Sequence, residues 1–367
     1  MAYTTIDDPS AYFQTALFTG NGGTNAITNT GNSDLQPNMV WFKCRSATEH
    51  HGIFDSVRGV TKVIYPNLNN TEDSLADSLA SFNSNGFTMG ADTGSGGAFN
   101  GDTKTMAAWQ WKAGTSFTND ASSTGIGTID STGSVNTTSG FSVISYTGTG
   151  NNNETVGHGL GVAPSVVIIK NRSITTNWSV LHTSAGLTGT TLDGSAEYYM
   201  LVLNDTGARG NVSEDNIWNP TSTTFKINNS GAGNQVNGNG NSMIAYCFAE
   251  KQGYSKFGSY TGNGSTDGTF VYTGFKPAWL LVKSTAANDW ILHDTKRSPH
   301  NVSNVTLFPN DSSADVTNTI YNQDILSNGF KARTTHARLN GSGVTYIYMA
   351  FAENPFVTST GVPATAR

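Results

Sequence analysis

The chain has 367 residues, of which 13% are charged and 41 are glycine, and its formal net charge is −6. An acidic chain without a basic stripe is not expected to bind nucleic acid, and its apolar runs are too short to span a membrane. Ser, Thr and Asn fill most of the other polar positions, which favours strands and turns over long charged helices.

The first sixteen residues show no strand pattern. They lack the basic start and apolar centre of a signal peptide, so we expect a chain made and kept in a cytoplasm until it assembles. Asp7, Asp8 and Pro9 favour an extended or turn conformation. We predict that residues 1–16 are an anchor segment that becomes ordered on a neighbouring protein.

One seven-residue pattern occurs three times. A proline stands six residues before a lysine, with an apolar run between them, at Pro37–Lys43, Pro164–Lys170 and Pro277–Lys283. Proline can begin a strand because its missing N–H then falls outside the ladder. The continuous apolar run favours a strand covered on both faces. We expect each lysine to mark the return of the chain to solvent.

Other features recur around each of these strands. An aromatic residue followed by Thr-Gly comes first, and a second alternating strand, an asparagine turn and a closing apolar strand follow. The aromatic residues are Phe18, Tyr146 and Tyr260; the second strands begin at His51, Trp178 and Trp290; the turns end at Asn67, Asn204 and Asn310. The spacing is that of a domain and not of a solenoid repeat.

The recurrence predicts an all-β fold with three tandem copies of an antiparallel β-sandwich or jelly-roll-like domain. The copies are expected at residues 17–115, 140–253 and 254–356. Residues 116–139 have almost no charge or bulk and are predicted to be a linker. Residues 357–367 are predicted to be an extended C-terminal tail. Within the first copy, Thr71–Phe82 favours a short helix, because Leu75 and Leu79 are four residues apart after an acidic start.

Residues with catalytic or metal-binding chemistry form no recognisable motif. Glycan cleavage needs two carboxylates about 5–10 Å apart, and each candidate is better explained by a helix start or a strand end; these are Glu72, Asp73, Asp77, Glu214, Asp215, Glu250 and Glu353. The histidines lack zinc-site spacing. Cys44 and Cys247 are expected to be buried reduced thiols. We predict no catalytic residue, no metal and no cofactor, although loops 150–154 and 309–315 offer oxygen ligands for calcium without the EF-hand pattern.

The tryptophans divide into two groups. Trp41, Trp178, Trp279 and Trp290 lie in predicted strands and are expected in the core. An insertion in the second copy instead places aromatic and charged residues on loops, where binding tends to reside; these are Tyr198, Tyr199, Arg209, Asp215 and Trp218. We expect this region to contact a neighbouring subunit or a glycan, with the subunit favoured because bare aromatics promote aggregation.

Several blocks of the sequence are similar to those of a known family. DDPSAYFQTALFTGNGG (Asp7–Gly23), HGIFDSVRG (His51–Gly59) and YMAFAENPF (Tyr348–Phe356) resemble a domain family without assigned function from the genomes of tailed phages, especially marine ones. Its members are usually labelled virion structural or tail-fibre-like proteins.

The resemblance implies a non-enzymatic virion protein, most simply a tail fibre or receptor-binding appendage that contacts a host-surface glycan. By analogy with phage fibres, the implied partners are two further copies in a homotrimer, and other virion proteins bound through residues 1–16. Two alternatives remain open: a capsid decoration or head-fibre protein, and a tailspike that depolymerises polysaccharide. The place of the protein in the virion would distinguish a tail fibre from a capsid decoration or head fibre. New reducing ends in a host polysaccharide incubated with the protein would reveal a depolymerase.

Overall fold

The computed structural model describes residues 2–190, 196–210, 217–228 and 234–365. Nearly all of its regular structure is antiparallel β, with one short helix, α1 (Ala121–Thr124), and two 3-10 turns, η1 (Pro9–Ala11) and η2 (Thr183–Ala185). The predicted all-β class is therefore confirmed. None of the helices in these ranges is long and apolar enough to cross a membrane.

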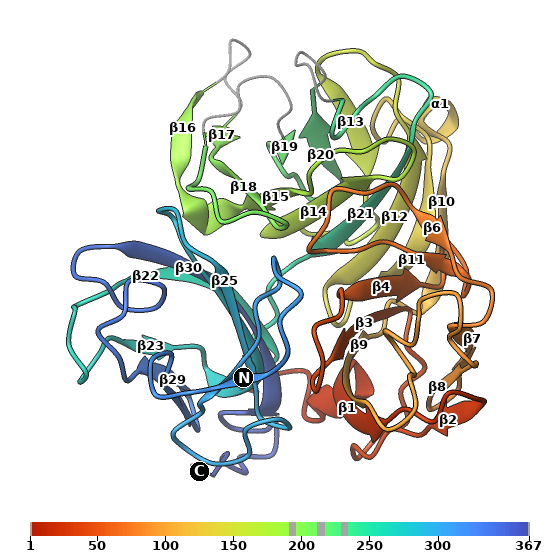
Figure 1. The fold of residues 1–367 in the computed structure, drawn as a ribbon. Helices are drawn as coiled ribbons and strands as arrows, with labels where there is room; N and C mark the ends of the chain where they lie inside the picture. The colour runs from red at the N-terminus through yellow and green to blue at the C-terminus, as the bar shows by residue number, and fades with distance from the viewer. Residues whose placement is uncertain (1, 191–195, 211–216, 229–233, 366–367) are drawn as a thin grey trace.

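Three lobes surround a common centre (Figure 1). We call residues 13–111 the first unit (red to orange), 115–248 the second unit (yellow to green) and 255–355 the third unit (cyan to blue). In each unit four strands pair in the same chain-order pattern: β1-β9-β3-β4, β12-β21-β14-β15 and β22-β30-β24-β25. A smaller three-stranded sheet accompanies each: β2-β8-β7, β13-β20-β19 and β23-β29-β28.

The strands of the first unit are β1 (Phe13–Thr19), β2 (Asn25–Ile27), β3 (Met39–Cys44), β4 (Gly52–Asp55), β5 (Lys62–Val63), β6 (Asp73–Ser74), β7 (Leu79–Asn83), β8 (Gly86–Met89) and β9 (Thr105–Trp111). Those of the second unit are β10 (Thr115–Asn119), β11 (Ser131–Asn136), β12 (Phe141–Thr147), β13 (Glu154–Gly157), β14 (Val166–Asn171), β15 (Ser179–His182), β16 (Leu187–Thr190), β17 (Ala196–Tyr198), β18 (Met200–Val202), β19 (Ile217–Trp218), β20 (Thr224–Ile227) and β21 (Ser242–Phe248). Those of the third unit are β22 (Ser255–Thr261), β23 (Phe270–Tyr272), β24 (Phe275–Ser284), β25 (Trp290–Asp294), β26 (Val305–Thr306), β27 (Val316–Thr317), β28 (Gln323–Leu326), β29 (Gly329–Ala332) and β30 (Thr345–Pro355).

The apolar runs of the repeated pattern form strands that are buried on both faces. In β3, Val40 and Phe42 pack with Phe87 of the small sheet into the first unit's own core. Trp41 points the other way, because side chains alternate along a strand, and joins a second core. The same alternation divides Ile168 from Ile169 in β14. Each unit is therefore a sandwich whose larger sheet also has a buried outer face.

The second core is shared by all three units. Trp41 and Trp111 of the first unit have ring centroids 6.5 and 5.6 Å from that of Trp279 in the third. Phe248 of the second unit lies 5.8 Å from Phe351 of the third. The predicted core positions of Trp41, Trp178, Trp279 and Trp290 are confirmed, since all four side chains are buried in this shared core.

One buried asparagine per unit fixes the Thr-Gly loop, a role that the sequence pattern had not revealed. The side-chain amide of Asn100 donates to Gly23 O at 2.8 Å, that of Asn237 to Asn151 O at 2.7 Å, and that of Asn340 to Ser265 O at 2.8 Å. All three side chains are fully buried. The chain reverses around these amides. In each of the three units, a buried asparagine therefore fixes the conformation of the loop that follows β1, β12 or β22.

Two local predictions were wrong. Thr71–Phe82 forms no helix but contains β6 and the start of β7, because Asp77 accepts hydrogen bonds from Thr93 and Gly94 instead of capping a helix. Residues 116–139 are not a linker: β10 and β11 pair with each other and extend the second unit's large sheet beyond β12. Small residues are required there, since a Cβ on Gly133 would lie 2.0 Å from Val143 O.

The three prolines of the repeated pattern have the same position relative to the neighbouring strand, but they differ in whether they precede or lie inside their own strand. Pro37 and Pro164 each stand two residues before the first residue of β3 and β14. Pro277 instead lies inside β24, where the pairing with β30 shifts register on both sides of it. Such an irregularity tolerates a residue without an N–H. The expectation that proline begins the strand is thus wrong for the third unit.

The described terminal segments, residues 2–16 and 357–365, pack on the rest of the chain. Ile6 is buried in the shared core, and Thr4 Oγ1 donates to Gln252 O at 2.7 Å. In the predicted anchor, residues 1–16, the described residues 2–16 are therefore ordered by contacts within their own chain, and β1 already begins at Phe13. The described part of the predicted C-terminal tail folds back, with Thr358 N–H donating to Val362 O, and Ser359 N–H donates to the Asp7 carboxylate at 2.6 Å.

Candidate functional site

The three lysines of the repeated pattern do not return to water. Lys43, Lys170 and Lys283 are fully buried, and burial lowers the pKa of each to about 8. Their ammonium groups donate to backbone carbonyls, which supply the shell that water would otherwise provide. The prediction of solvent exposure was wrong because at least one carbonyl around each lysine comes from a loop distant in sequence.

Each lysine joins its own unit to another. Lys43 Nζ donates to Ser312 O of the third unit at 3.0 Å, Lys170 Nζ to Asn69 O of the first at 3.0 Å, and Lys283 Nζ to Gly207 O of the second at 2.9 Å. A carbonyl of the same unit completes each contact. The lysine hydrogen bonds between units are therefore cyclic: the first unit donates to the third, the second to the first, and the third to the second.

The residues at the start of the second strand of each repeated pattern donate hydrogen bonds between units in the same cyclic order. Trp178 Nε1 donates to Tyr65 O and Trp290 Nε1 to Val202 O, both at 2.9 Å. In the first unit His51 takes this place. Its Nδ1 accepts from Trp41 Nε1, so Nε2 carries the proton and donates to Phe308 O at 3.2 Å. The recurring asparagines support these strands, since Asn67, Asn204 and Asn310 accept from the backbone N–H groups of His51, Trp178 and Trp290.

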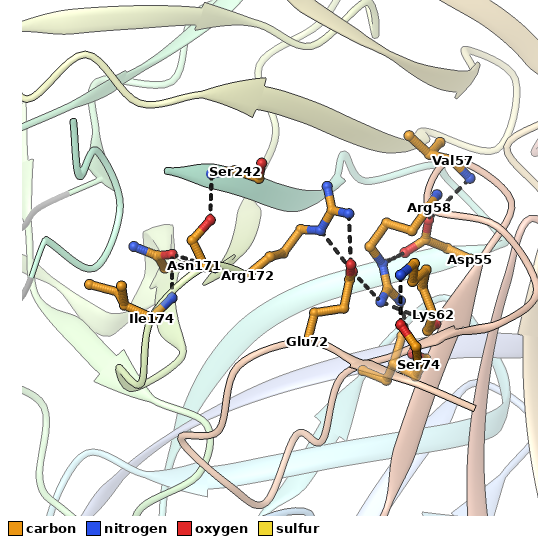
Figure 2. A network of polar contacts seen from close by, with 12 residues as sticks. Asp55, Val57, Arg58, Lys62, Glu72, Ser74, Asn171, Arg172, Ile174 and Ser242 are labelled. Atoms are coloured by element: carbon orange, nitrogen blue, oxygen red, sulfur yellow. Dashed lines mark hydrogen bonds and ion pairs between the residues drawn. The ribbon is translucent and has the colours of Figure 1, made fainter. Parts of the chain in front are cut away.

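Figure 2 shows the network between the first and second units. Glu72 accepts from Arg172 Nε at 2.7 Å and from Arg58 Nη1 at 3.2 Å. Arg58 also pairs with Asp55 at 2.5 Å, and neither of these side chains is exposed. Burial raises the pKa of Glu72, but the two guanidinium groups outweigh it and leave the pKa below its usual value. Glu72 is held as an anion between two cations. Because Arg58 belongs to the first unit and Arg172 to the second, these ion pairs join the two units.

The other candidate carboxylates also have partners. Glu250 pairs with Lys256 at 2.9 Å, Glu353 with Lys276 at 2.8 Å, and Asp73 accepts from Tyr65. Glu214 lies outside the described residues. In the calcium-candidate loop 309–315, Asp315 binds Arg45 and Arg297. Among the residues with described positions, no group of three or more His, Cys, Asp or Glu side chains is placed to hold a metal ion. Cys44 and Cys247 are buried free thiols, as predicted.

Arg209, in the described part of the second unit's insertion, contacts the third unit. The Arg209 guanidinium carbon lies 4.3 Å from the centroid of the Tyr199 ring, and Arg209 N–H donates to Thr285 O at 2.9 Å. The structure thus brings together two of the five predicted binding residues. Tyr198 and Trp218 belong to β17 and β19 by backbone, while their side chains, and Asp215 entirely, lie outside the described residues.

A polar cleft of about 440 Å³ lies between the first and third units and the N-terminal segment. This volume is within the range of small-molecule sites. The cleft is lined by residues 8, 10, 13–15 and 30–32 on one side and by residues 278, 295, 296, 299 and 352–354 on the other.

Hydrogen bonds fix the first-unit wall of the cleft. Gln14 Nε2 donates to the carbonyls of Ser10 and Ser33 at 2.9 and 2.8 Å, and its Oε1 accepts from Gly31 N–H at 2.8 Å. Asp8 accepts from Ser10 N–H at 3.0 Å and from the Ser33 hydroxyl at 2.5 Å. This wall is therefore rigid before any ligand arrives, and it presents amide, hydroxyl and carboxylate oxygens.

The third-unit wall adds charge. Lys296 is exposed at the cleft, and its backbone N–H donates to the buried Asp294 at 3.1 Å, which positions the turn after β25. Glu353 enters from β30. Neither wall was predicted from sequence, because five separate stretches of chain meet here and none carries a motif.

A family model described as a domain of unknown function, DUF7483, matches residues 8–355. The chain belongs to the DUF7483 family. The match begins at Asp8 on the wall of the cleft and ends at the last residue of β30, so it includes all three units and the cleft. Searches among curated proteins and solved structures gave no match.

A substitution at one lysine tests whether the DUF7483 units depend on the buried ammonium groups. Lys170→Met removes the donor to Asn69 O and Thr176 O, and two buried carbonyls without a partner should lower the free energy of unfolding by about 2–4 kcal/mol. The exposed Lys296→Met is the control and should change it by less than about 0.5 kcal/mol. Denaturant titration followed by tryptophan fluorescence measures both. Equal or higher stability of Lys170→Met would mean that the cost of burying the charge exceeds the gain from its hydrogen bonds.

Proposed function

We propose that this protein is a virion structural protein of a tailed phage, a tail fibre or receptor-binding appendage, that binds a host-surface glycan in the cleft without cleaving it. The observation that carries the glycan assignment is the polar cleft between the first and third units, whose first-unit wall is fixed by hydrogen bonds. The virion assignment is supported by the resemblance of blocks such as Asp7–Gly23 and Tyr348–Phe356 to tail-fibre-like proteins.

The chemistry of the cleft suits sugars. A sugar ring presents several hydroxyl groups that both donate and accept, and Thr30 and Asn32 are exposed on one wall opposite Lys296 on the other. The exposed Pro299 supplies a small apolar surface for C–H groups. Because Gln14 and Asp8 are already fixed by neighbours, less side-chain entropy is lost on binding.

Two features support binding over hydrolysis. A glycosidase needs one carboxyl group as acid and a second as base or nucleophile. The carboxylates of the cleft are engaged otherwise: Asp8 accepts from Ser10 and Ser33, and Glu353 pairs with Lys276.

The proposal does not depend on a homotrimer. The shared core and the cyclic lysine contacts are closed within one chain. Copies of the protein in the virion would raise the overall affinity through effective concentration, whatever their number.

The test measures binding of the full chain to an array of bacterial surface polysaccharides and their oligosaccharides. We expect saturable binding to a subset, weakened at least tenfold in Asn32→Ala/Lys296→Ala and unchanged in Asn239→Ala, an exposed asparagine of the second unit. Immunogold labelling of particles should mark the tail. Labelling of the capsid with no glycan bound would contradict the proposal, and new reducing ends would show a depolymerase instead.

A further inference from the structure

The third unit has one sheet edge on which none of the described residues pairs. Strand β23 is the outer strand of the sheet β23-β29-β28. Ala332 N–H donates to Thr269 O at 3.2 Å and Thr273 N–H to Asn328 O at 3.0 Å, so Thr269 and Thr273 face β29. Because backbone groups alternate in direction along an antiparallel strand, Phe270 and Tyr272 direct their N–H and C=O groups away from the sheet.

The second unit covers the corresponding edge with its own chain. Val156 of β13 pairs with Phe225 as Val271 of β23 pairs with Phe330, so Thr155 corresponds to Phe270. Thr155 C=O accepts from the N–H groups of Thr128 and Ile129 at 2.9 and 3.1 Å, and its N–H donates to Thr128 Oγ1 at 2.9 Å. Ile129 and Val156 form a parallel bridge. In the second unit, the segment around Thr128 and Ile129 thus pairs with the edge of β13 that corresponds to the open edge of β23.

The open edge also carries aromatic side chains. Phe270 is 45% exposed and Tyr272 53%, on the same side of the strand, whereas Thr155 and Gly157 hold these places in the second unit. The Tyr272 hydroxyl lies 3.2 Å from that of Tyr3, which donates to Gly274 O at 2.7 Å, so the ring is held before any partner binds. An uncovered edge strand with bare aromatics promotes unspecific pairing, and proteins keep such edges for partners.

We propose that the β23 edge docks an extended, largely uncharged peptide segment of a partner protein. The segment adds a strand parallel to β23, exchanges backbone hydrogen bonds with Phe270, and lays apolar side chains on the rings of Phe270 and Tyr272, a recognition mode based on strand addition. A second copy of this chain fits less well, because a three-residue strand paired with itself buries far less than the area of a stable interface.

The test uses a peptide that copies the segment seated on β13. Acetylated and amidated GIGTIDST, the sequence of residues 125–132, is titrated into the full chain and followed by NMR shift changes. Phe270→Pro removes the outward N–H and leaves the ladder to β29 intact, since proline is tolerated on the free side of an edge strand. We expect saturable binding to the parent and at least tenfold weaker binding to Phe270→Pro. Tyr272→Ser should weaken binding several-fold.

The matched control is Ala26→Pro. Ala26 of β2 pairs with Thr88 as Phe270 pairs with Lys331, so this variant makes the same backbone change on the first unit's edge, where no aromatic side chain stands. It should bind the peptide within twofold of the parent. Circular dichroism must show unchanged folding for every variant.

Three outcomes would overturn the proposal. One is no saturable peptide binding to the parent at millimolar concentration, and another is an equal loss of binding in Ala26→Pro. The third is a parent dimer in sedimentation that Phe270→Pro dissociates, which would assign the edge to a second copy. Glycan binding in the cleft is measured separately with the Asn32 and Lys296 variants, so either proposal can fail alone.

Discussion

Heat or denaturant is expected to unfold the three units together in a single transition, and no unit is expected to fold alone. The outer faces of all three large sheets meet in one core, where Trp41, Ile168 and Leu281 come from different units. An isolated unit would expose this face and leave its lysine without the carbonyl that the neighbouring unit supplies. Exposing several fully buried tryptophans costs about 2–3 kcal/mol each or more, which is a large part of the stability of any domain.

Calorimetry provides the measurement. The calorimetric and van't Hoff enthalpies of the full chain should agree, as for a two-state protein. Fragments 1–113, 114–250 and 251–367 should lack cooperative unfolding and dispersed NMR spectra. A chain ending at Phe356 is the control for truncation and should keep the single transition. A fragment that unfolds cooperatively would show that its own sandwich core is sufficient.

Acid is expected to destabilise the protein steeply below about pH 6.5. Burial lowers the pKa of His158 and His182 to about 4 and that of His293 to about 3, and holds the pKa of His51 well below its usual value. Hydrogen bonds hold the neutral form: in His182, Nδ1 accepts from Ser184 N–H and Nε2 lies 3.1 Å from Tyr348 O.

The sign follows from proton binding. Between about pH 6.5 and 4 the unfolded chain protonates these histidines and the folded chain does not, so the free energy of unfolding falls as the pH falls. Each histidine contributes about 1.4 kcal/mol per pH unit in this range. Four of them are sufficient to unfold a protein of ordinary stability near about pH 5.

Denaturant titrations at several pH values between 7 and 5 measure this slope. His182→Gln should be less steep by about a quarter, whatever its stability at pH 7, because one of four titrating groups is gone. His300→Gln is the control, since His300 is exposed, and should keep the slope of the parent. A free energy of unfolding that does not change from pH 6.5 to 5 would contradict the assignment of neutral buried histidines.

The sequence allowed the strands to be predicted more readily than their surroundings. The apolar run before Lys43 indicates burial on both faces, and Val40 and Trp41 confirm it on opposite sides. What covers the second face was not predictable, because Trp279 and Trp41 lie far apart in the chain and carry no pairing signal. For the same reason Lys43 was predicted to be exposed to solvent, although its ammonium group donates a hydrogen bond to Ser312 O.

Composition gave a wrong prediction for residues 116–139, where small residues pack in strands and do not form a flexible linker. Ser131 and Ser134 are buried in β11, yet a stretch rich in Gly, Ser and Thr has the composition of a linker. The spacing of Leu75 and Leu79 fits a helix, but tertiary hydrogen bonds to Asp77 prevail over local propensity. The cleft could not be predicted at all, since Gln14 and Lys296 are ordinary polar residues until the fold brings their segments together.

The cyclic contacts between units have a consequence for how this protein can change over time. In an assembly of three identical chains, every substitution appears at three places at once, so each must be tolerated in triplicate. Here one gene encodes all three contact sites, and they already differ. Tyr246 donates to Asp55 and Trp109 to Asp294, whereas the third site joins His182 to the backbone of Tyr348. A substitution at one contact site therefore need not be repeated at the other two.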